Sequence, residues 1–162
     1  IALFLSSLLG YVGISLLIWM YILGTRSVSS LFIKDIPKSV KLHSKLGKYG
    51  VALVLFHPLL VAFSYGNNII QYVFLPNLTN SFEKHVTYGR AAFAALLVTW
   101  ITSAVVRGKI AFRPWKYIHY LAYVALPLSL LHVPRIGSSY PEKLIQFYWM
   151  LFIFVYLIIT AL

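Results

Sequence analysis

Four of the five histidines stand in apolar stretches of the sequence and form two pairs by their spacing. His43 and His57 are fourteen residues apart, and His119 and His132 are thirteen apart. An ionisable side chain inside a membrane is costly and usually marks a functional site, and neutral imidazole is a common metal ligand. The chain has no cysteine, which excludes disulfides, thiolate metal sites and iron–sulfur clusters. We therefore expect any redox chemistry to come from a bound cofactor.

The helices that must position these histidines follow from the composition. Hydrophobic residues make up 60% of the 162 residues and charged residues only 10%, which indicates a membrane protein. A bilayer core needs about 20 apolar residues per helix. The sequence predicts an all-α membrane protein whose single domain, 1–162, is a bundle of five transmembrane helices. The expected spans are 1–24, 43–65, 85–106, 114–133 and 141–162.

The basic residues predict how the helices are oriented. The formal net charge is +11, but these charges flank apolar spans, so membrane orientation explains them better than nucleic-acid binding. They gather after the first and third spans, where the sequence has Arg26, Lys34, Lys38, Lys41, Arg107, Lys109, Arg113 and Lys116. By the positive-inside rule these links are cytoplasmic. We expect the N-terminus outside and the C-terminus, at Leu162, on the cytoplasmic side.

The histidine spacing fits two stacked cofactors. The second and fourth spans run in the same direction, so His43 and His119 lie toward the inside, and His57 and His132 toward the outside. At 1.5 Å per residue the two levels are about 20 Å apart. That leaves room for two haems, each with one imidazole from each helix. Such six-coordinate iron suits transfer of single electrons because no position stays open for a substrate.

The helical faces support one histidine pair better than the other. With a spacing of fourteen residues, His43 and His57 point in directions about 40° apart around the helix axis, so they share one face. We expect Gly47 and Gly50 on that face to make room for a macrocycle. A spacing of thirteen leaves His119 and His132 about 140° apart on an ideal helix. Pro127 is a candidate for a local distortion.

Other interpretations of the histidines remain open. They can be packed side chains hydrogen-bonded to neighbouring helices. A shared tetrahedral zinc site is excluded because the two levels are too far apart. His85, at the outer start of the third span, is expected to be interfacial, and a role near the outer haem is the alternative.

Two sequence stretches resemble the ferric-reductase-like transmembrane domain of NADPH oxidases and ferric reductases, which has bacterial members. The first is LHSKLGKYGVALVLFHPLL, with His43, Gly47 and His57. The second has the pattern W-x-x-x-H-x-x-x-Y, formed by Trp115, His119 and Tyr123, and ends at His132. Members usually have six helices here, and the five of this chain match the last five.

The resemblance implies a route for electrons and a set of cofactors. Electrons would pass from NAD(P)H to FAD, to an inner haem b, to an outer haem b, and then to dioxygen, giving superoxide, or to ferric iron. The chain has no G-x-G-x-x-G after a strand. We therefore expect the dehydrogenase after Leu162 in the parent chain or in a partner protein. The chain starts at Ile1 without a methionine and ends in an apolar run, so we expect it to be a fragment of a longer protein of a bacterial plasma membrane.

Three further residues are candidates for supporting the haems. Arg90 is the candidate partner for a propionate of the outer haem, although snorkelling to the interface also explains it. Trp100 and Tyr123 are candidates for an aromatic relay or for simple packing.

Two rival functions remain open. One rival function is a haem subunit that oxidises quinol to feed an extracytoplasmic reductase. The other, of a different class, is a non-haem proton-coupled transporter.

Overall fold

A computed structural model describes residues 1–66, 68–137 and 141–161 of the protein, and no strand occurs among them. The prediction of an all-α membrane protein is confirmed. The elements are α1 (Ala2–Gly24), α2 (Arg26–Phe32), α3 (Ile36–Tyr65), α4 (Ile69–Phe74), α5 (Ser81–Ile101), a π-helical turn η1 (Thr102–Val106), α6 (Phe112–His119), α7 (Leu121–Ile136) and α8 (Lys143–Ala161). Leu162, the last residue of the fifth expected span, lies outside the described residues.

Two long helices begin earlier than the expected spans at 43 and 85. At the start of α3, an Asp35 carboxylate oxygen accepts a hydrogen bond from the backbone N–H of Lys38 at 3.1 Å. At the start of α5, the Asn80 side chain accepts one from the N–H of Glu83 at 2.9 Å. These caps satisfy backbone donors that the helix leaves free. Hydropathy detects only the apolar part, whereas capping extends each helix into the polar first turns.

Within the described residues, four helices are long and apolar enough to cross a membrane: α1, α3, α5 with η1, and α8. The fourth expected span, 114–133, is divided between α6 and α7 at Tyr120. The N–H of Tyr120 bonds to the carbonyls of Lys116 and Tyr117, and the N–H of Tyr123 bonds to the Tyr120 carbonyl at 3.0 Å. The bonds from Tyr120 to Tyr117 and from Tyr123 to Tyr120 span three residues and tighten the turn. The break therefore comes directly after His119 and not at Pro127, which lies inside α7.

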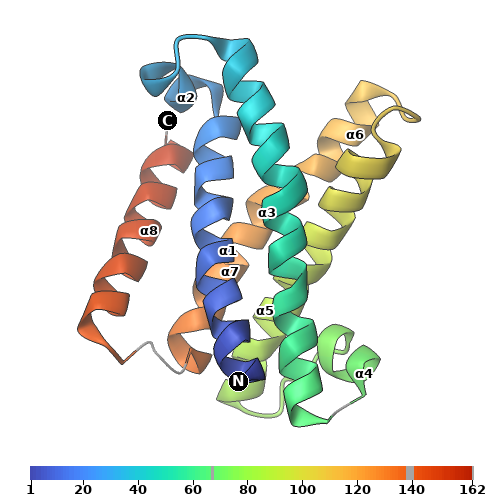
Figure 1. Ribbon diagram of the computed structural model, residues 1–162, viewed down its shortest axis with the longest axis vertical. Helices are drawn as coiled ribbons and strands as arrows, with labels where there is room; N and C mark the ends of the chain where they lie inside the picture. Colours follow the sequence, from blue (N-terminus) through green and yellow to red (C-terminus); the bar gives the residue numbers. More distant parts are fainter. Residues whose placement is uncertain (67, 138–140, 162) are drawn as a thin grey trace.

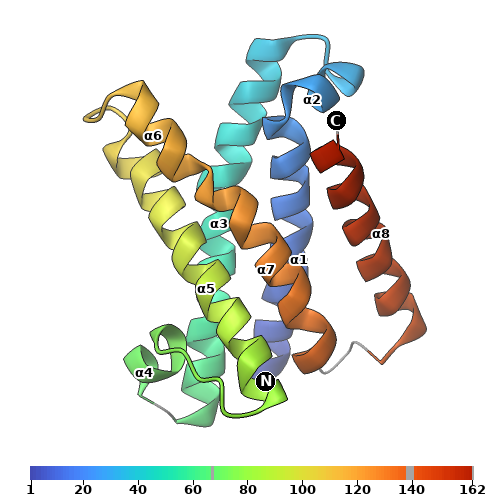
Figure 2. The same cartoon turned by 180° about the vertical axis from the view of Figure 1, so that it is seen from behind.

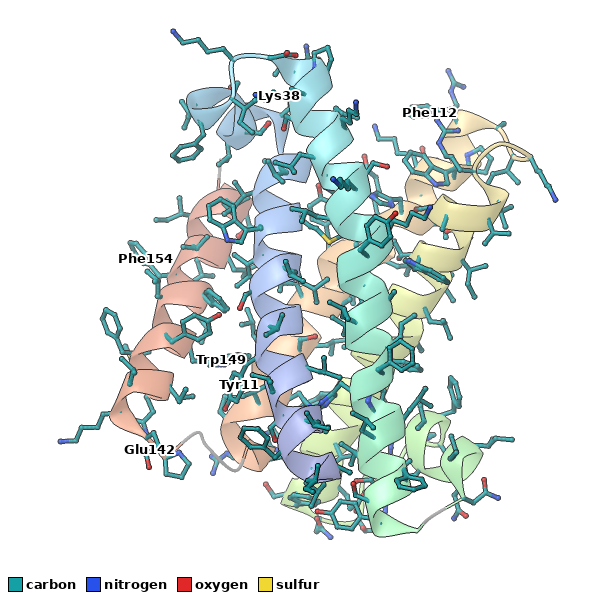
Figure 3. All side chains as sticks on the ribbon, in the orientation of Figure 1. Tyr11, Lys38, Phe112, Glu142, Trp149 and Phe154 are labelled. Carbon is teal, nitrogen blue, oxygen red and sulfur yellow. The ribbon has the colours of Figure 1, made fainter. Side chains whose placement is uncertain are left out.

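The bundle consists of two closely packed helix pairs and a flanking helix. α1 packs along α3, and α5 along α7, whereas α3 and α7 have little backbone contact in the described part of the chain. Figure 1 shows α8 beside α1. Figure 2, from behind, shows α6 and α7 following one another past α5. Outward side chains such as Phe154, which is 60% exposed, cover the surface that would face lipid (Figure 3).

The two ends of the bundle differ in charge. α2 and α6 lie at one end, near the end of α8, while α4 and the N-terminus lie at the other (Figure 1). Figure 3 labels Lys38 and Phe112 at the first end and Glu142 at the second. Both basic links therefore lie at the same end, which we call the basic end, and the opposite end is the α4 end.

An aliphatic core occupies the middle of the bundle. It includes Ile14 and Leu17 of α1, Val51 of α3, Leu96 of α5, and Leu126 of α7, all less than a tenth exposed. Each lies in its helix between the residues that contact the two histidine levels. The core therefore separates the two histidine pairs and holds their helices at a fixed spacing.

Candidate cofactor site: two pairs of histidines

The structure brings the four helical histidines together in two pairs. The ring centroids of His43 and His119 are 6.0 Å apart, with the ring planes at 71°. Those of His57 and His132 are 6.4 Å apart, at 90°. Each pair spans from α3 to the α6–α7 segment. The pairs therefore link the two helix pairs of the bundle at two levels, one near the basic end and one near the α4 end.

Both histidines of α3 are held by backbone carbonyls of α1. His43 Nδ1 lies 2.9 Å from the Met20 carbonyl oxygen. His57 Nδ1 lies 2.8 Å from the Ser6 carbonyl oxygen, and the Ser6 hydroxyl donates to the backbone carbonyl of His57 at 3.1 Å. A carbonyl only accepts, so both Nδ1 atoms carry the proton. Both rings are thereby fixed in one tautomer.

The other two histidines are held by α5 and η1. His132 Nδ1 donates to the backbone carbonyl of His85 at 2.8 Å. His119 Nδ1 lies 3.2 Å from the hydroxyl of Ser103, in the π-helical turn. Its ring also stacks on Trp115, with centroids 4.9 Å apart and planes at 23°. The guanidinium of Arg107 lies 4.3 Å from the Trp115 ring centroid, on the basic end.

In His43, His57 and His132, where Nδ1 carries the proton, Nε2 is the ring nitrogen available to a metal. All four rings use Nδ1 in a hydrogen bond to a neighbouring helix, which is the usual support of a metal-bound imidazole. A metal midway between two imidazoles, at about 2.0–2.1 Å from each nitrogen, would place the ring centroids about 6.3 Å apart, since each centroid lies about 1.1 Å behind its nitrogen. The observed centroid separations of 6.0 and 6.4 Å agree with that distance.

A cavity of about 280 Å³ adjoins the histidine pair at the α4 end. Its wall includes Gly10 of α1, His57 of α3, Gly89 and Arg90 of α5, His132 of α7 and Trp149 of α8. Apolar atoms dominate the wall, and the polar groups come from several helices. Such a mix suits a largely apolar ligand with a few polar substituents.

The family comparison agrees with this arrangement of helices. The profile of the family described as "Ferric reductase like transmembrane component" matches residues 9–130 of the 162. The chain belongs to this family. The match takes in residues 9–24 of α1 as well as most of the stretch from Leu42 to His132 that carries the resemblance, and it stops two residues before His132. No curated protein and no solved structure matches the chain.

Membership indicates an integral membrane component of an oxidoreductase and, at the level of the family, electron transfer across the membrane. In this ferric-reductase-like chain, no group of three or more His, Cys, Asp or Glu side chains that could hold a metal ion occurs among residues 1–66, 68–137 and 141–161. The imidazoles are arranged in twos, one pair at each level.

The two glycines expected to make room for a macrocycle lie against α1. A Cβ at Gly47 would meet the Met20 side chain at 3.3 Å, and one at Gly50 would meet Leu16 at 3.2 Å. Three other glycines lie against the histidine rings, namely Gly10, Gly24 and Gly89. Spacing along α3 alone could not identify them, because they belong to the helices that face the histidines.

Arg90 lies in the wall of the cavity and is already engaged with the loop at the α4 end. Its Nε donates to the Tyr72 carbonyl at 2.5 Å and its Nη1 to the Leu75 carbonyl at 2.8 Å, with Glu83 at 3.7 Å. Burial raises the pKa of the Tyr72 phenol, and Tyr65 adds to the rise while Arg90 opposes it. The phenol is therefore neutral at physiological pH, and the salt-bridge partner of Arg90 is Glu83.

The remaining candidates have structural partners. Trp100 Nε1 donates to the Lys48 carbonyl at 3.1 Å, which ties α5 to α3. Tyr123 packs edge-on against Tyr21 of α1, with centroids 5.0 Å apart. The His85 ring bonds to its own helix, at the Ser81 carbonyl. It is the backbone of His85, and not its ring, that contacts the histidine pair.

Trp149 is a site residue that the sequence did not reveal. It is 1% exposed, and its Nε1 donates to the Leu130 carbonyl at 3.1 Å. That carbonyl lacks its normal helical partner because Pro134, four residues later, has no N–H. Figure 3 shows Trp149 on α8, between α8 and α1. In the sequence, Pro134, which directly follows the fourth expected span, marks a carbonyl that needs a donor from another helix, but only the structure identifies Trp149 as that donor.

Proposed function

We propose that this chain carries electrons across the membrane through two b-type haems. His43 and His119 hold the iron of one haem, and His57 and His132 hold that of the other. The observation that carries the proposal is the double set of facing imidazoles, 6.0 and 6.4 Å apart between centroids, all with Nδ1 engaged. Held by these residues, haem would supply an iron that gains and loses one electron at a time.

The residues present fit this cofactor in their chemistry. Nδ1–H bonds to the carbonyls of Ser6, Met20 and His85 make the imidazoles better electron donors toward a metal. The cavity at the α4 end gives one pair apolar surroundings. α3 and α7 have little backbone contact, and the two histidine pairs connect α3 to the α6–α7 segment at both levels. The aliphatic core keeps the two levels about 20 Å apart along α3.

The charge distribution supports a direction for the electrons. We take the basic end as cytoplasmic by the positive-inside rule. An NAD(P)H- and FAD-binding dehydrogenase, in the same parent chain or in a partner protein, delivers electrons there, close to His43 and His119. The acceptor, dioxygen or ferric iron, is reduced beyond the α4 end, close to His57 and His132.

The test is a pyridine haemochrome assay on the purified full-length protein with each of the four histidines replaced by alanine in turn. The wild type is expected to hold two haems per chain, and each variant to lose about one, because a single axial ligand does not keep the iron six-coordinate. His85→Ala is the matched control, since only its backbone contacts His132. Unchanged haem content in all four variants would reject the proposal, and a wild type without a Soret band would favour a transporter.

A further inference from the structure

We infer that Gly10, Gly24 and Gly89 are positioning residues that expose backbone carbonyls to the histidine rings. The inference rests on the proposed function and deepens it, because it names groups outside the ligand set that decide how three ligands are held. Each glycine stands four residues after a carbonyl that accepts from a histidine Nδ1. The carbonyls belong to Ser6, Met20 and His85.

The reason for the four-residue offset is the geometry of the α-helix. The carbonyl of residue i points toward the N–H of residue i+4, so the side chain of residue i+4 stands beside it. With glycine at that position, an imidazole from another helix can approach the carbonyl from the side. The ring then occupies the volume that a Cβ would fill.

The contacts show how tightly each ring fills that volume. A Cβ on Gly89 would lie 2.3 Å from Cε1 and 2.4 Å from Nδ1 of His132. A Cβ on Gly24 would lie 3.1 Å from Cε1 of His43, and one on Gly10 would lie 3.2 Å from Nδ1 of His57. Alanine at Gly89 is therefore incompatible with the observed ring position, whereas alanine at the other two displaces the ring by a few tenths of an ångström.

The device is repeated along α1 with the period of the histidines. Ser6 and Met20 are fourteen residues apart, as are Gly10 and Gly24, and as are His43 and His57 on α3. Because α1 and α3 run antiparallel with the same rise per residue, equal spacing places equivalent groups opposite each other at both levels. The fourth histidine, His119, departs from the pattern and uses the Ser103 hydroxyl.

The experiment compares glycine-to-alanine variants of the full-length protein by haem content, redox titration and low-temperature electron paramagnetic resonance. Low-spin haem signals depend on the orientation of the axial rings. Gly89→Ala is expected to lose or shift the component of the His57–His132 pair and to leave the other unchanged. Gly24→Ala is expected to shift only the component of the His43–His119 pair, with its haem retained.

Two glycines serve as controls. A Cβ on Gly108 meets nothing within 4 Å, and one on Gly13 would lie 2.4 Å from Val54 Cγ2, in the α1–α3 contact and away from the histidines. Gly108→Ala should change nothing, and Gly13→Ala should lower stability without selecting one haem component. Should Gly89→Ala prevent folding, Gly24→Ala still decides the matter.

The outcomes separate the inference from the proposed function. A wild type with two haems whose signals are indifferent to Gly89→Ala and Gly24→Ala overturns the inference alone. The same holds if Gly13→Ala shifts the components as much as these two variants do. A wild type without haem overturns the proposed function itself.

Discussion

The hydrogen bond between Trp149 and Leu130 makes a quantitative prediction about the turn that carries His132. Trp149→Phe keeps an aromatic ring but removes the N–H that serves the Leu130 carbonyl, 3.1 Å away and buried. Leaving a buried acceptor without a partner costs about 1–3 kcal/mol, and measured interhelical hydrogen bonds in membrane proteins average about 0.6 kcal/mol, with a maximum of about 1.7. We expect Trp149→Phe to lower the free energy of unfolding by about 1 kcal/mol beyond the effect of its smaller volume.

A double-mutant cycle with Pro134→Ala isolates the hydrogen bond. Alanine at 134 restores the N–H that an uninterrupted helix would direct to the Leu130 carbonyl, so that carbonyl no longer depends on Trp149. The volume lost in Trp149→Phe is the same in both backgrounds and cancels in the cycle. We therefore expect Trp149→Phe to cost about 1 kcal/mol less in the Pro134→Ala background.

The assay is reversible unfolding in mixed detergent micelles, followed by far-ultraviolet circular dichroism, which does not depend on the removed tryptophan. His132 lies between Leu130 and Pro134 in α7, so redox titration of the same proteins should show the change mainly at the His57–His132 pair. An equal cost of Trp149→Phe in both backgrounds would refute the reasoning, because the carbonyl would then not be what Trp149 serves.

Two other substitutions test the contacts around the histidine pairs. Arg90→Gln removes the charge that holds the carbonyls of Tyr72 and Leu75. Because hydrogen bonds to a charged group contribute about 1.5–3 kcal/mol, the rate of amide hydrogen exchange in 69–78 should rise by about tenfold or more. Unchanged protection in 69–78 would contradict the anchoring role of Arg90. Ser103→Ala removes the partner of His119 Nδ1. If the hydroxyl accepts from Nδ1–H, losing this hydrogen bond makes the His119 imidazole a weaker electron donor to the iron. The reduction potential of the haem at the His43–His119 pair then rises by up to about 40 mV for a bond worth about 1 kcal/mol. A shift at the other haem would count against the assignment.

Much of the architecture could be predicted from the sequence because membrane insertion is encoded locally. Apolar length sets the spans, and the clustering of basic residues predicts which links lie together, as the shared position of α2 and α6 shows (Figure 1). Hydropathy did not predict the helix starts at Ile36 and Ser81, because the caps at Asp35 and Asn80 extend these helices over polar residues. The histidines themselves stand out because ionisable groups in apolar spans are rare.

The surroundings of the histidines were decided by tertiary structure. The spacing of His119 and His132 was a difficulty only for a continuous helix, and the break at Tyr120 depends on backbone hydrogen bonds that no composition reveals. Gly10, Gly24 and Gly89 acquire their role from rings on other helices. Sequence periodicity describes one helix at a time, whereas a carbonyl exposed on one helix and an imidazole extended from another meet only when packing sets the register between them.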